Sequence, residues 1–325
     1  MRAMLCTEFN GTDGLQLGEI DEPVPEAGEI LVDVHAASVS FMDYLMVSGG
    51  YQMRPDLPYV PGTDGAGVVA AVGDKVTKFK KGDRVTCSDW YGAFAERMTS
   101  KEWKAVKIPD GVDFAPASTM LHNYNTAYYA LVQRAALQKD ETLLVTGATG
   151  GVGLAVVDVG RKLGAKVIAA VGGPEKASFV TEYGADEAID YRNEDLRERV
   201  KALTGGAGVD VCFENVGGAT FQTMGRLMNW GGRLMPVGFA SGAIPELPMN
   251  LPLLKSYSIV GVNTGLWTQR FPDEARRVNE IVMAWLAEGE VRPYIDRVLP
   301  LENAAEAMQA IADRTVRGRI VLQVR

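Results

Sequence analysis

A cluster of glycines at residues 147–153 has the spacing of a phosphate-binding loop. It follows an apolar run at 142–146, which predicts a strand, and precedes an apolar stretch at 154–163, which predicts a helix. At such a junction the glycine backbone can approach a pyrophosphate closely, and the N-terminus of the helix favours its negative charge. The sequence therefore predicts a dinucleotide site. The residues expected to line it are Thr149, Gly150, Gly151 and Val152.

The loop departs from the usual G-x-G-x-x-G pattern at its first position, where Ala148 replaces glycine. We expect Gly150 and Gly151 to make the tight turn, and Gly153 to let the helix pack closely on the strand. A turn that binds nothing is the alternative, because clustered glycines alone are weak evidence. The strand and helix around the loop favour the dinucleotide site.

The end of the next predicted strand, at 166–171, indicates which dinucleotide fits. NAD-binding proteins commonly place a carboxylate here, against the ribose hydroxyls. This chain has Gly172 and Gly173 instead, and Lys176 follows three residues later. Because no carboxylate at the strand end repels a 2′-phosphate and Lys176 offers a cation, the sequence predicts NADPH in preference to NADH. The alternative is that Glu175 and Lys176 are simply solvated at a helix start.

Composition and charge exclude several classes of partner. The chain has 325 residues, enough for two domains, with 33 basic and 41 acidic side chains and a net charge of −8. This balance argues against nucleic acid or an anionic membrane surface as a partner. No apolar stretch approaches the ~20 residues of a membrane span, and the N-terminus lacks the apolar segment of a signal peptide. We therefore expect a cytoplasmic protein that acts on a small molecule.

Metal chemistry has few candidate ligands in this sequence. Cys6, Cys87 and Cys212 are far apart, so neither a disulfide framework nor a C-x-x-C motif is present. The two histidines, His35 and His122, are also isolated, whereas a catalytic zinc site needs several clustered ligands. The sequence therefore predicts no metal site.

Two patterns of secondary structure divide the chain. Residues 1–118 contain short apolar segments broken by glycine and proline, which is typical of a β-rich domain. Between 119 and 264 predicted strands and helices alternate, which specifies a doubly wound parallel sheet covered by helices. Residues 265–325 end in a predicted strand at 319–324 that we expect to rejoin the first domain. The predicted class is α/β. The expected elements of the middle segment include strands at 142–146, 166–171, 209–213, 232–237 and 258–262, and helices at 126–136 and 154–163.

Four segments of the sequence carry a resemblance to known proteins. They are Pro61-Gly62-Thr63-Asp64-Gly65-Ala66-Gly67-Val68-Val69, the loop at 150–153, Asn215-Val216-Gly217-Gly218 and Gly231-Gly232-Arg233. In this order they resemble the medium-chain dehydrogenase/reductase superfamily, and the zinc-free NADPH:quinone oxidoreductases within it are most similar. The resemblance spans nearly the whole chain and implies a GroES-like catalytic domain, split in sequence, around an inserted Rossmann domain.

Departures from the zinc alcohol dehydrogenases of the superfamily agree with the shortage of ligands. This chain has Ser40 where those enzymes have a cysteine ligand, and Gly62-Thr63-Asp64 where they have Gly-His-Glu. Cys87 is alone where they have a cysteine-rich lobe for a structural zinc. The resemblance therefore implies that the zinc ligands are absent.

The resemblance also implies which side chains bind the cofactor. Lys176 and Tyr191 match positions that bind the 2′-phosphate in similar reductases, and Arg314 resembles a third. Ser40 stands where an asparagine usually contacts the nicotinamide ribose, and the loops after the strands at 209–213 and 232–237 edge the nicotinamide. The implied set, besides the glycine loop, is Ser40, Thr126, Gly172, Lys176, Tyr191, Asn215, Phe239, Ser241, Asn263 and Arg314.

The resemblance implies a zinc-independent, NADPH-dependent oxidoreductase that transfers hydride to a quinone or an α,β-unsaturated carbonyl compound. Without a metal, the acceptor oxygen needs hydrogen-bond donors. The sequence identifies no catalytic residue, and Tyr44, Tyr51 and Tyr59 are candidates only. A non-catalytic NADPH-binding protein, crystallin-like or RNA-binding, is the alternative, and an alcohol dehydrogenase is favoured less. Likeness to the family also suggests a homodimer, in which residues 258–262 could extend the sheet across two subunits.

Overall fold

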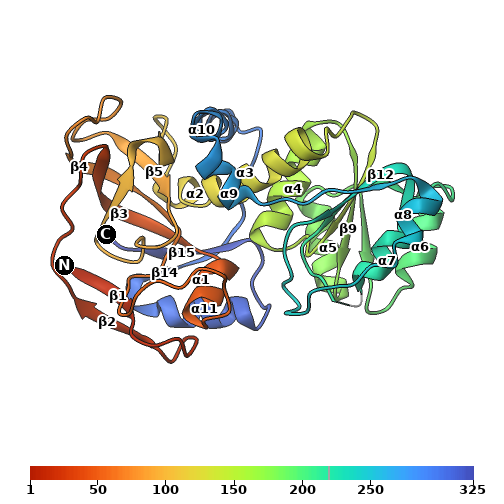
Figure 1. Cartoon of the computed structure of the whole chain (residues 1–325), viewed down its shortest axis with the longest axis horizontal. Helices are drawn as coiled ribbons and strands as arrows, with labels where there is room; N and C mark the ends of the chain where they lie inside the picture. The colour runs from red at the N-terminus through yellow and green to blue at the C-terminus, as the bar shows by residue number, and fades with distance from the viewer. Residues whose placement is uncertain (219) are drawn as a thin grey trace. The chain divides into compact units, whose positions relative to one another are not determined.

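Residues 1–218 and 220–325 are described by the computed structural model (Figure 1). They form two units, of which the first combines residues 1–125 with 267–325 and the second contains residues 126–266. The boundaries fall within helix α3 (Met120–Tyr128) and helix α9 (Thr264–Arg270). In the described ranges, none of the helices is long and apolar enough to cross a membrane.

The first unit is built on a mixed, mainly antiparallel sheet. Its longest strand, β3, pairs antiparallel with β4, β6 and β15, so the last strand of the chain lies beside a strand from its beginning. A separate hairpin joins β1 (Arg2–Cys6) to β2 (Leu15–Glu19). The strands of the main sheet are β3 (Glu29–Val39), β4 (Asp64–Val72), β5 (Arg84–Ser88), β6 (Arg97–Lys101), β7 (Ala105–Lys107), β14 (Ile295–Pro300) and β15 (Arg319–Gln323).

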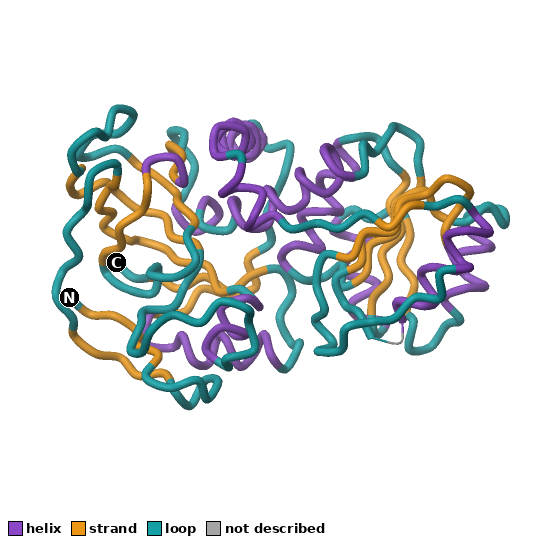
Figure 2. Tube along the Cα trace, in the orientation of Figure 1, coloured by secondary structure: helices purple, strands orange, loops and turns teal. Residues whose placement is uncertain are grey.

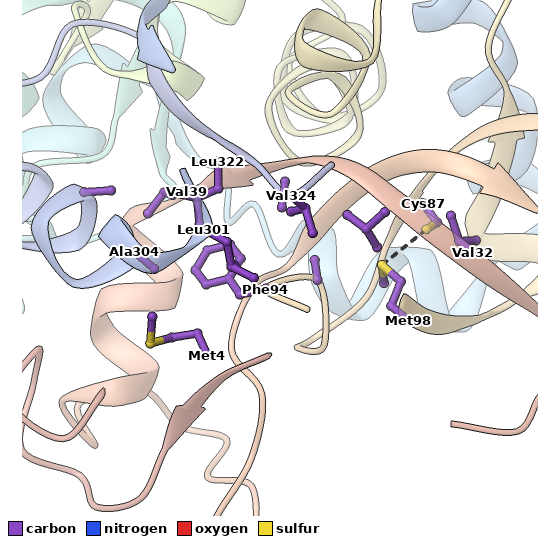
Figure 3. Packing of buried hydrophobic residues seen from close by; sticks show 14 of the residues in the cluster. Met4, Val32, Val39, Cys87, Phe94, Met98, Leu301, Ala304, Leu322 and Val324 are labelled. Carbon is purple, nitrogen blue, oxygen red and sulfur yellow. Dashed lines mark hydrogen bonds between the residues drawn. The ribbon is translucent and has the colours of Figure 1, made fainter. Parts of the chain in front are cut away.

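Apolar side chains from both ends of the sequence form the core of this unit (Figure 3). Val39 and Leu322 are fully buried on neighbouring strands, beside Phe94 and Ala304. Cys87 packs with its Sγ 3.7 Å from the Met98 Sδ, which makes it a core residue. The helices of the unit are α1 (Phe41–Val47), α2 (Phe114–Ala117), α10 (Pro272–Ala287) and α11 (Ala304–Ala312), with short 3₁₀ turns at Glu102–Lys104 and Leu301–Asn303.

The second unit is a six-stranded parallel sheet in the order β10-β9-β8-β11-β12-β13, with helices on both faces (Figure 2). The chain runs outward from β8 to β10, then returns to the other side of β8 and continues to β13. Neighbouring connections therefore diverge between β8 and β11, the place where sheets of this kind bind ligands. The strands are β8 (Thr142–Thr146), β9 (Lys166–Val171), β10 (Glu187–Asp190), β11 (Val209–Glu214), β12 (Met228–Pro236) and β13 (Ser258–Ile259). The helices are α4 (Gly151–Lys162), α5 (Pro174–Tyr183), α6 (Leu196–Leu203), α7 (Thr220–Leu227) and α8 (Asn250–Lys255).

The predicted α/β class is confirmed, with some corrected boundaries. Helix α4 begins at Gly151, three residues before the predicted start. Glycine is tolerated at these positions because they form the first turn of the helix, where the N–H groups need no intrahelical partner. The predicted helix at 126–136 is the end of α3 followed by a π-helix at Tyr129–Arg134. The assigned strand β13 is shorter than the predicted 258–262, yet Val260 N and Val262 N still donate to Leu234 O and Pro236 O.

Candidate functional site

The glycine loop between β8 and α4 turns at Gly147, not at the predicted Gly150 and Gly151. Gly147 has φ +59°, a left-handed conformation that favours glycine. Gly150 N then donates to Gly147 O at 3.1 Å, and Gly150 itself is the N-cap of α4 with an ordinary φ of −80°. The glycine that the pattern seemed to lack at Ala148 is therefore supplied one residue earlier.

Gly153 and Gly150 differ in the space around them. A Cβ on Gly153 would lie 2.3 Å from Gly147 O and 2.7 Å from Ala148 Cα, so only glycine fits where the first turn of α4 touches the loop. The sequence suggested that Gly153 lets the helix pack closely on the strand. In the structure, Gly153 instead lies close to the loop at Gly147 and Ala148. A Cβ on Gly150 would meet only Gly147 O, at 3.6 Å. The backbone of Gly150 is therefore open to a ligand. Around it, Thr149 is buried, and Gly151 and Val152 are half-buried.

A buried carboxylate at the end of β11 organises the next loop. Glu214 Oε1 accepts hydrogen bonds from Thr146 Oγ1 (3.1 Å), Val216 N (3.0 Å) and Gly217 N (3.1 Å). Its Oε2 accepts from Gly217 N at 3.0 Å. Burial raises the pKa of Glu214, against the effect of these donors. Glu214 is absent from the predicted set, although an acidic residue at the end of a buried apolar strand was a usable signal.

The structure brings together three predicted nicotinamide-side residues, Asn215, Phe239 and Ser241. Ala240 N donates to Asn215 O at 3.1 Å, and Ser241 N donates to Val216 O at 2.8 Å, so the loops that follow β11 and β12 are joined. The Asn215 side chain lies over the glycine loop, because a Cβ on Gly147 would be 2.6 Å from Asn215 Oδ1.

A second cluster lies at the end of β9, where the sequence predicts the 2′-phosphate site. A Cβ on Gly172 would lie 3.0 Å from both the Tyr191 hydroxyl oxygen and Arg192 Nε. Lys176 lies in the first turn of α5 and is half-buried. The structure therefore places Tyr191 over Gly172 and adds Arg192, which the sequence analysis missed even though it follows a predicted site residue directly.

Asp190 fixes the chain that carries these two side chains. Its Oδ1 accepts from Gly173 N at 2.6 Å and from Arg192 N at 3.1 Å, and its Oδ2 accepts from Asn193 Nδ2 at 2.6 Å. Burial opposes ionisation, but these donors prevail and lower the pKa of Asp190. The carboxylate is thus ionised and bound by two backbone N–H groups and the Asn193 side-chain amide.

In the first unit, Ser40 is the N-cap of α1 and forms a capping box with Asp43. Ser40 Oγ donates to Asp43 Oδ2 at 2.6 Å, and Asp43 N donates back to Ser40 Oγ at 3.1 Å. Ser40 is 2% exposed. Its hydroxyl hydrogen is already used, so toward a further partner this hydroxyl can only accept.

Behind Ser40 lies a buried group of charges that the sequence analysis did not identify. Arg319 Nη1 donates to Val39 O at 2.9 Å, while Nε and Nη2 both donate to Asn123 Oδ1. Burial raises the pKa of Asp64 to about 7, although the positive charge of Arg319 opposes the rise. Burial and the same guanidinium lower the pKa of His122 to about 3. Among residues 1–218 and 220–325, no three His, Cys, Asp or Glu side chains are grouped so that they could hold a metal ion.

The three candidate tyrosines have different surroundings. Tyr44 stacks on Phe41 with ring centroids 6.1 Å apart, and Tyr51 packs against Trp90 at 6.2 Å. Both are half-buried, and burial raises the pKa of Tyr51, which keeps that phenol protonated at neutral pH. Tyr59 is only 6% exposed and belongs to the hydrophobic core.

The remaining predicted residues are divided between the units. Thr126 is buried in α3, and Asn263 is exposed, with its Oδ1 accepting from Leu266 N at 3.0 Å. Both belong to the second unit, whereas Arg314 lies in the first, after α11, with φ +59°. In the Gly231-Gly232-Arg233 motif, Arg233 has a structural role, since Nη1 and Nη2 donate to the two carboxylate oxygens of Glu141 at 2.8 and 2.6 Å.

Family models match both parts of the chain. Residues 26–110 match the alcohol dehydrogenase GroES-like domain, and residues 151–280 match the zinc-binding dehydrogenase family. The chain is 38% identical to quinone oxidoreductase-like protein 2 homolog of Nematostella vectensis, over all of this chain and 89% of the relative. It is 35% identical to human quinone oxidoreductase, over 96% of this chain and 94% of the relative.

A solved structure agrees with these matches. The quinone oxidoreductase of Escherichia coli, crystallised in complex with NADPH, superposes with a TM-score of 0.93 at 29% identity, and the whole of each chain is covered. The resemblance inferred from the motifs is confirmed. The chain therefore belongs to the quinone oxidoreductase family of the medium-chain dehydrogenase/reductase superfamily.

Proposed function

We propose that this protein is a zinc-independent, NADPH-dependent oxidoreductase that reduces a quinone or an α,β-unsaturated carbonyl compound. The observation that carries the proposal is the carboxyl edge of the parallel sheet. At this edge, Gly150 follows β8, Gly172 follows β9, and the loop that carries Asn215 follows β11 and is joined to the loop after β12. Tyr191 and Arg192, which follow β10, place donors over Gly172. Ligands of this fold bind at this edge.

The residues present fit NADPH. The glycine loop suits the pyrophosphate, since Gly150 leaves its backbone uncovered at the start of α4. Tyr191 and Lys176 would bind the 2′-phosphate beside Gly172, with Arg314 as a further cation. Residues of the joined loops would lie beside the nicotinamide. Thr126 and Asn263 would be the remaining residues of the second unit that contact the cofactor. The cofactor-side residues of these loops are Asn215, Phe239 and Ser241.

NADPH, when bound, supplies the hydride, and the protein must position the reactants and stabilise developing charge. Ser40 would serve as an acceptor for a ribose hydroxyl, because its own hydrogen is donated to Asp43. Asp43 thereby fixes the direction of the Ser40 lone pair. This role differs from that of an asparagine at the same position, whose amide both donates and accepts.

Zinc independence is supported by the chemistry of the side chains at the expected ligand positions. Ser40 and Thr63 offer hydroxyl groups in place of the soft thiolate and imidazole ligands that zinc prefers. Ser40 is also occupied with Asp43, and Thr63 is fully buried. Polarisation of the acceptor oxygen then depends on hydrogen-bond donors. Tyr44 and Tyr51 are the better candidates for this role, because Tyr59 lies in the core.

The test is NADPH oxidation with a simple quinone and with an enone, before and after treatment with a metal chelator. Turnover that survives chelation is expected. Loss of activity with the metal, together with stoichiometric zinc by elemental analysis, would favour an alcohol dehydrogenase. Tight NADPH binding without turnover of either acceptor would favour the non-catalytic alternative.

We further propose a homodimer formed through the edge of the parallel sheet. Among the described residues, β13 is the edge strand of the sheet, so its outer N–H and C=O groups have no partner strand and can pair with a second copy. A two-fold axis would place two such edges antiparallel and extend the sheet. Between Trp230 and Ile259, the segment that leads to this edge strand exposes large apolar side chains. They are Trp230 (72%), Ile244 (79%), Met249 (67%), Leu253 (77%), Leu254 (68%) and Ile259 (41%).

A further inference from the structure

We propose that Arg192 supplies the guanidinium that binds the 2′-phosphate of NADPH, so that the Rossmann domain carries its own arginine for this group. The inference rests on the proposed function. It adds to the expected residues Lys176, Tyr191 and Arg314 one that follows Tyr191 directly in the sequence.

Two donors converge over one glycine. A Cβ on Gly172 would lie 3.0 Å from the Tyr191 hydroxyl oxygen and 3.0 Å from Arg192 Nε, so these two donors lie at most 6.0 Å apart beside Gly172. A phosphate placed next to them could accept a hydrogen bond from each. A guanidinium presents planar, paired donors that match a phosphate, whereas the ammonium of Lys176 acts as a point charge.

The backbone of this segment is held in place by hydrogen bonds. Tyr191 N donates to Val171 O at 3.0 Å, and Arg192 N donates to Asp190 Oδ1 at 3.1 Å. The same Asp190 oxygen accepts from Gly173 N, which ties the chain after β10 to the chain after β9. The Tyr191 and Arg192 side chains therefore start from a fixed platform beside Gly172, which lowers the conformational entropy lost on binding.

The local charges also favour Arg192 as a phosphate-binding residue. In the part of the chain that the structure describes, the Arg192 guanidinium has no ion pair with a carboxylate at salt-bridge distance, and Asp190 is occupied with backbone N–H groups. Arg192 is exposed, so its guanidinium is available to an anion from solvent. Asp190 would repel the phosphate less than a free carboxylate, because its two oxygens already accept three hydrogen bonds.

The experiment measures dissociation constants of NADPH and NADH by calorimetry for the wild type and for Arg192→Gln. Arg197→Gln is the matched control, since Arg197 is an exposed arginine on α6 of the same unit. We expect Arg192→Gln to weaken NADPH binding by ~10-fold or more, as for loss of a charge-assisted contact, and to leave NADH binding unchanged. Arg197→Gln should change neither constant.

A second variant, Gly172→Ala, tests the placement of these two donors. The added Cβ would lie 3.0 Å from the Tyr191 hydroxyl oxygen and from Arg192 Nε, which are side-chain atoms, so the fold should persist while the two donors are displaced. Adenosine 2′,5′-bisphosphate and 5′-AMP serve as probes that lack the nicotinamide. Both variants should weaken the bisphosphate and spare 5′-AMP.

Three results would overturn the assignment of Arg192. In one, Arg192→Gln binds NADPH as tightly as the wild type does, whereas Arg314→Gln loses the preference for NADPH over NADH. In another, Arg192→Gln weakens NADPH and NADH equally, which indicates a structural role. In the third, the wild type itself shows no preference for NADPH, and this result, seen without any variant, contradicts the proposed cofactor as well.

Discussion

Both carboxylate oxygens of Glu214 lie within hydrogen-bond distance of the same backbone N–H, that of Gly217, at 3.1 and 3.0 Å. Through this contact and through Thr146 Oγ1, one buried side chain connects the end of β8, the end of β11 and the loop that carries Asn215. The backbone N–H groups of Val216 and Gly217 are used internally, and we propose that the Asn215 side chain is the part of this loop that faces the ligand.

Glu214→Gln is expected to raise the KM for NADPH and to lower the stability of the Rossmann domain. Glutamine replaces one acceptor oxygen with an amide donor, so a donor is left facing the backbone N–H groups of the loop. Loss of a buried hydrogen bond to a charged group costs ~1.5–3 kcal/mol. Steady-state kinetics and thermal unfolding measure the two effects. Glu182→Gln, an exposed change on α5, is the control, and an unaltered KM in Glu214→Gln would contradict the role of the loop.

Gly150→Ala is expected to weaken NADPH binding without loss of stability. Gly150 has φ −80°, and an added Cβ would meet only Gly147 O, at 3.6 Å, so alanine fits the ligand-free protein. The methyl group would stand on the open backbone that we assign to the pyrophosphate. Calorimetry should show NADPH affinity reduced by ~10-fold or more, equivalent to 1.4 kcal/mol or more. Unchanged affinity in a stable Gly150→Ala variant would place the pyrophosphate elsewhere.

The sequence was sufficient to predict the parallel sheet and the location of its loops. Apolar runs bounded by glycines mark β8, β9 and β11 because buried parallel strands need no polar alternation. The start of α4 was misplaced because glycine is poor in helix interiors but acceptable in the first turn. The sharp turn was assigned to Gly150 and Gly151, since a left-handed φ at Gly147 depends on backbone geometry that the motif does not encode.

Residues that act through long-range contacts could not be predicted. Arg319 and Asn123 are 196 positions apart, and their hydrogen bond depends on the return of β15 to β3. Glu214 and Arg192 each lie beside a predicted residue, but their direction depends on the tertiary fold. The position of Glu214 at the end of an apolar strand was a usable signal, but the sequence did not show that its carboxylate turns inward to the loop.

Stability is expected to depend on the ionisation of Asp64. Burial raises the pKa of this carboxyl to about 7, whereas an unfolded aspartic acid has a pKa of ~3.9. Between these values the folded state binds a proton that the unfolded state has released. The contribution of Asp64 to the free energy of unfolding is therefore largest below the unfolded pKa. It falls as the pH rises through the folded pKa, by at most ~1.4 kcal/mol per pH unit.

Asp64→Asn should remove this dependence, because an amide does not titrate. Denaturant unfolding between pH 5 and pH 8, compared with the wild type, should show the variant gaining relative stability as the pH increases. Asp56→Asn, a change at an exposed position, should follow the wild-type curve. Parallel curves for Asp64→Asn and the wild type would show that Asp64 is ionised throughout this range.

Ile259→Lys is expected to convert the proposed dimer to monomers. Ile259 is 41% exposed on the edge strand β13, where it pairs in register with Leu234 of β12. A lysine there would place a charge within an apolar contact between two edge strands. Native edge strands use such charges to prevent pairing. Sedimentation velocity of the wild type and the variant measures the change. Val24→Lys, at a position that is 82% exposed in the other unit, should leave the dimer intact. A wild type that sediments as a monomer at micromolar concentration would contradict the proposed dimer.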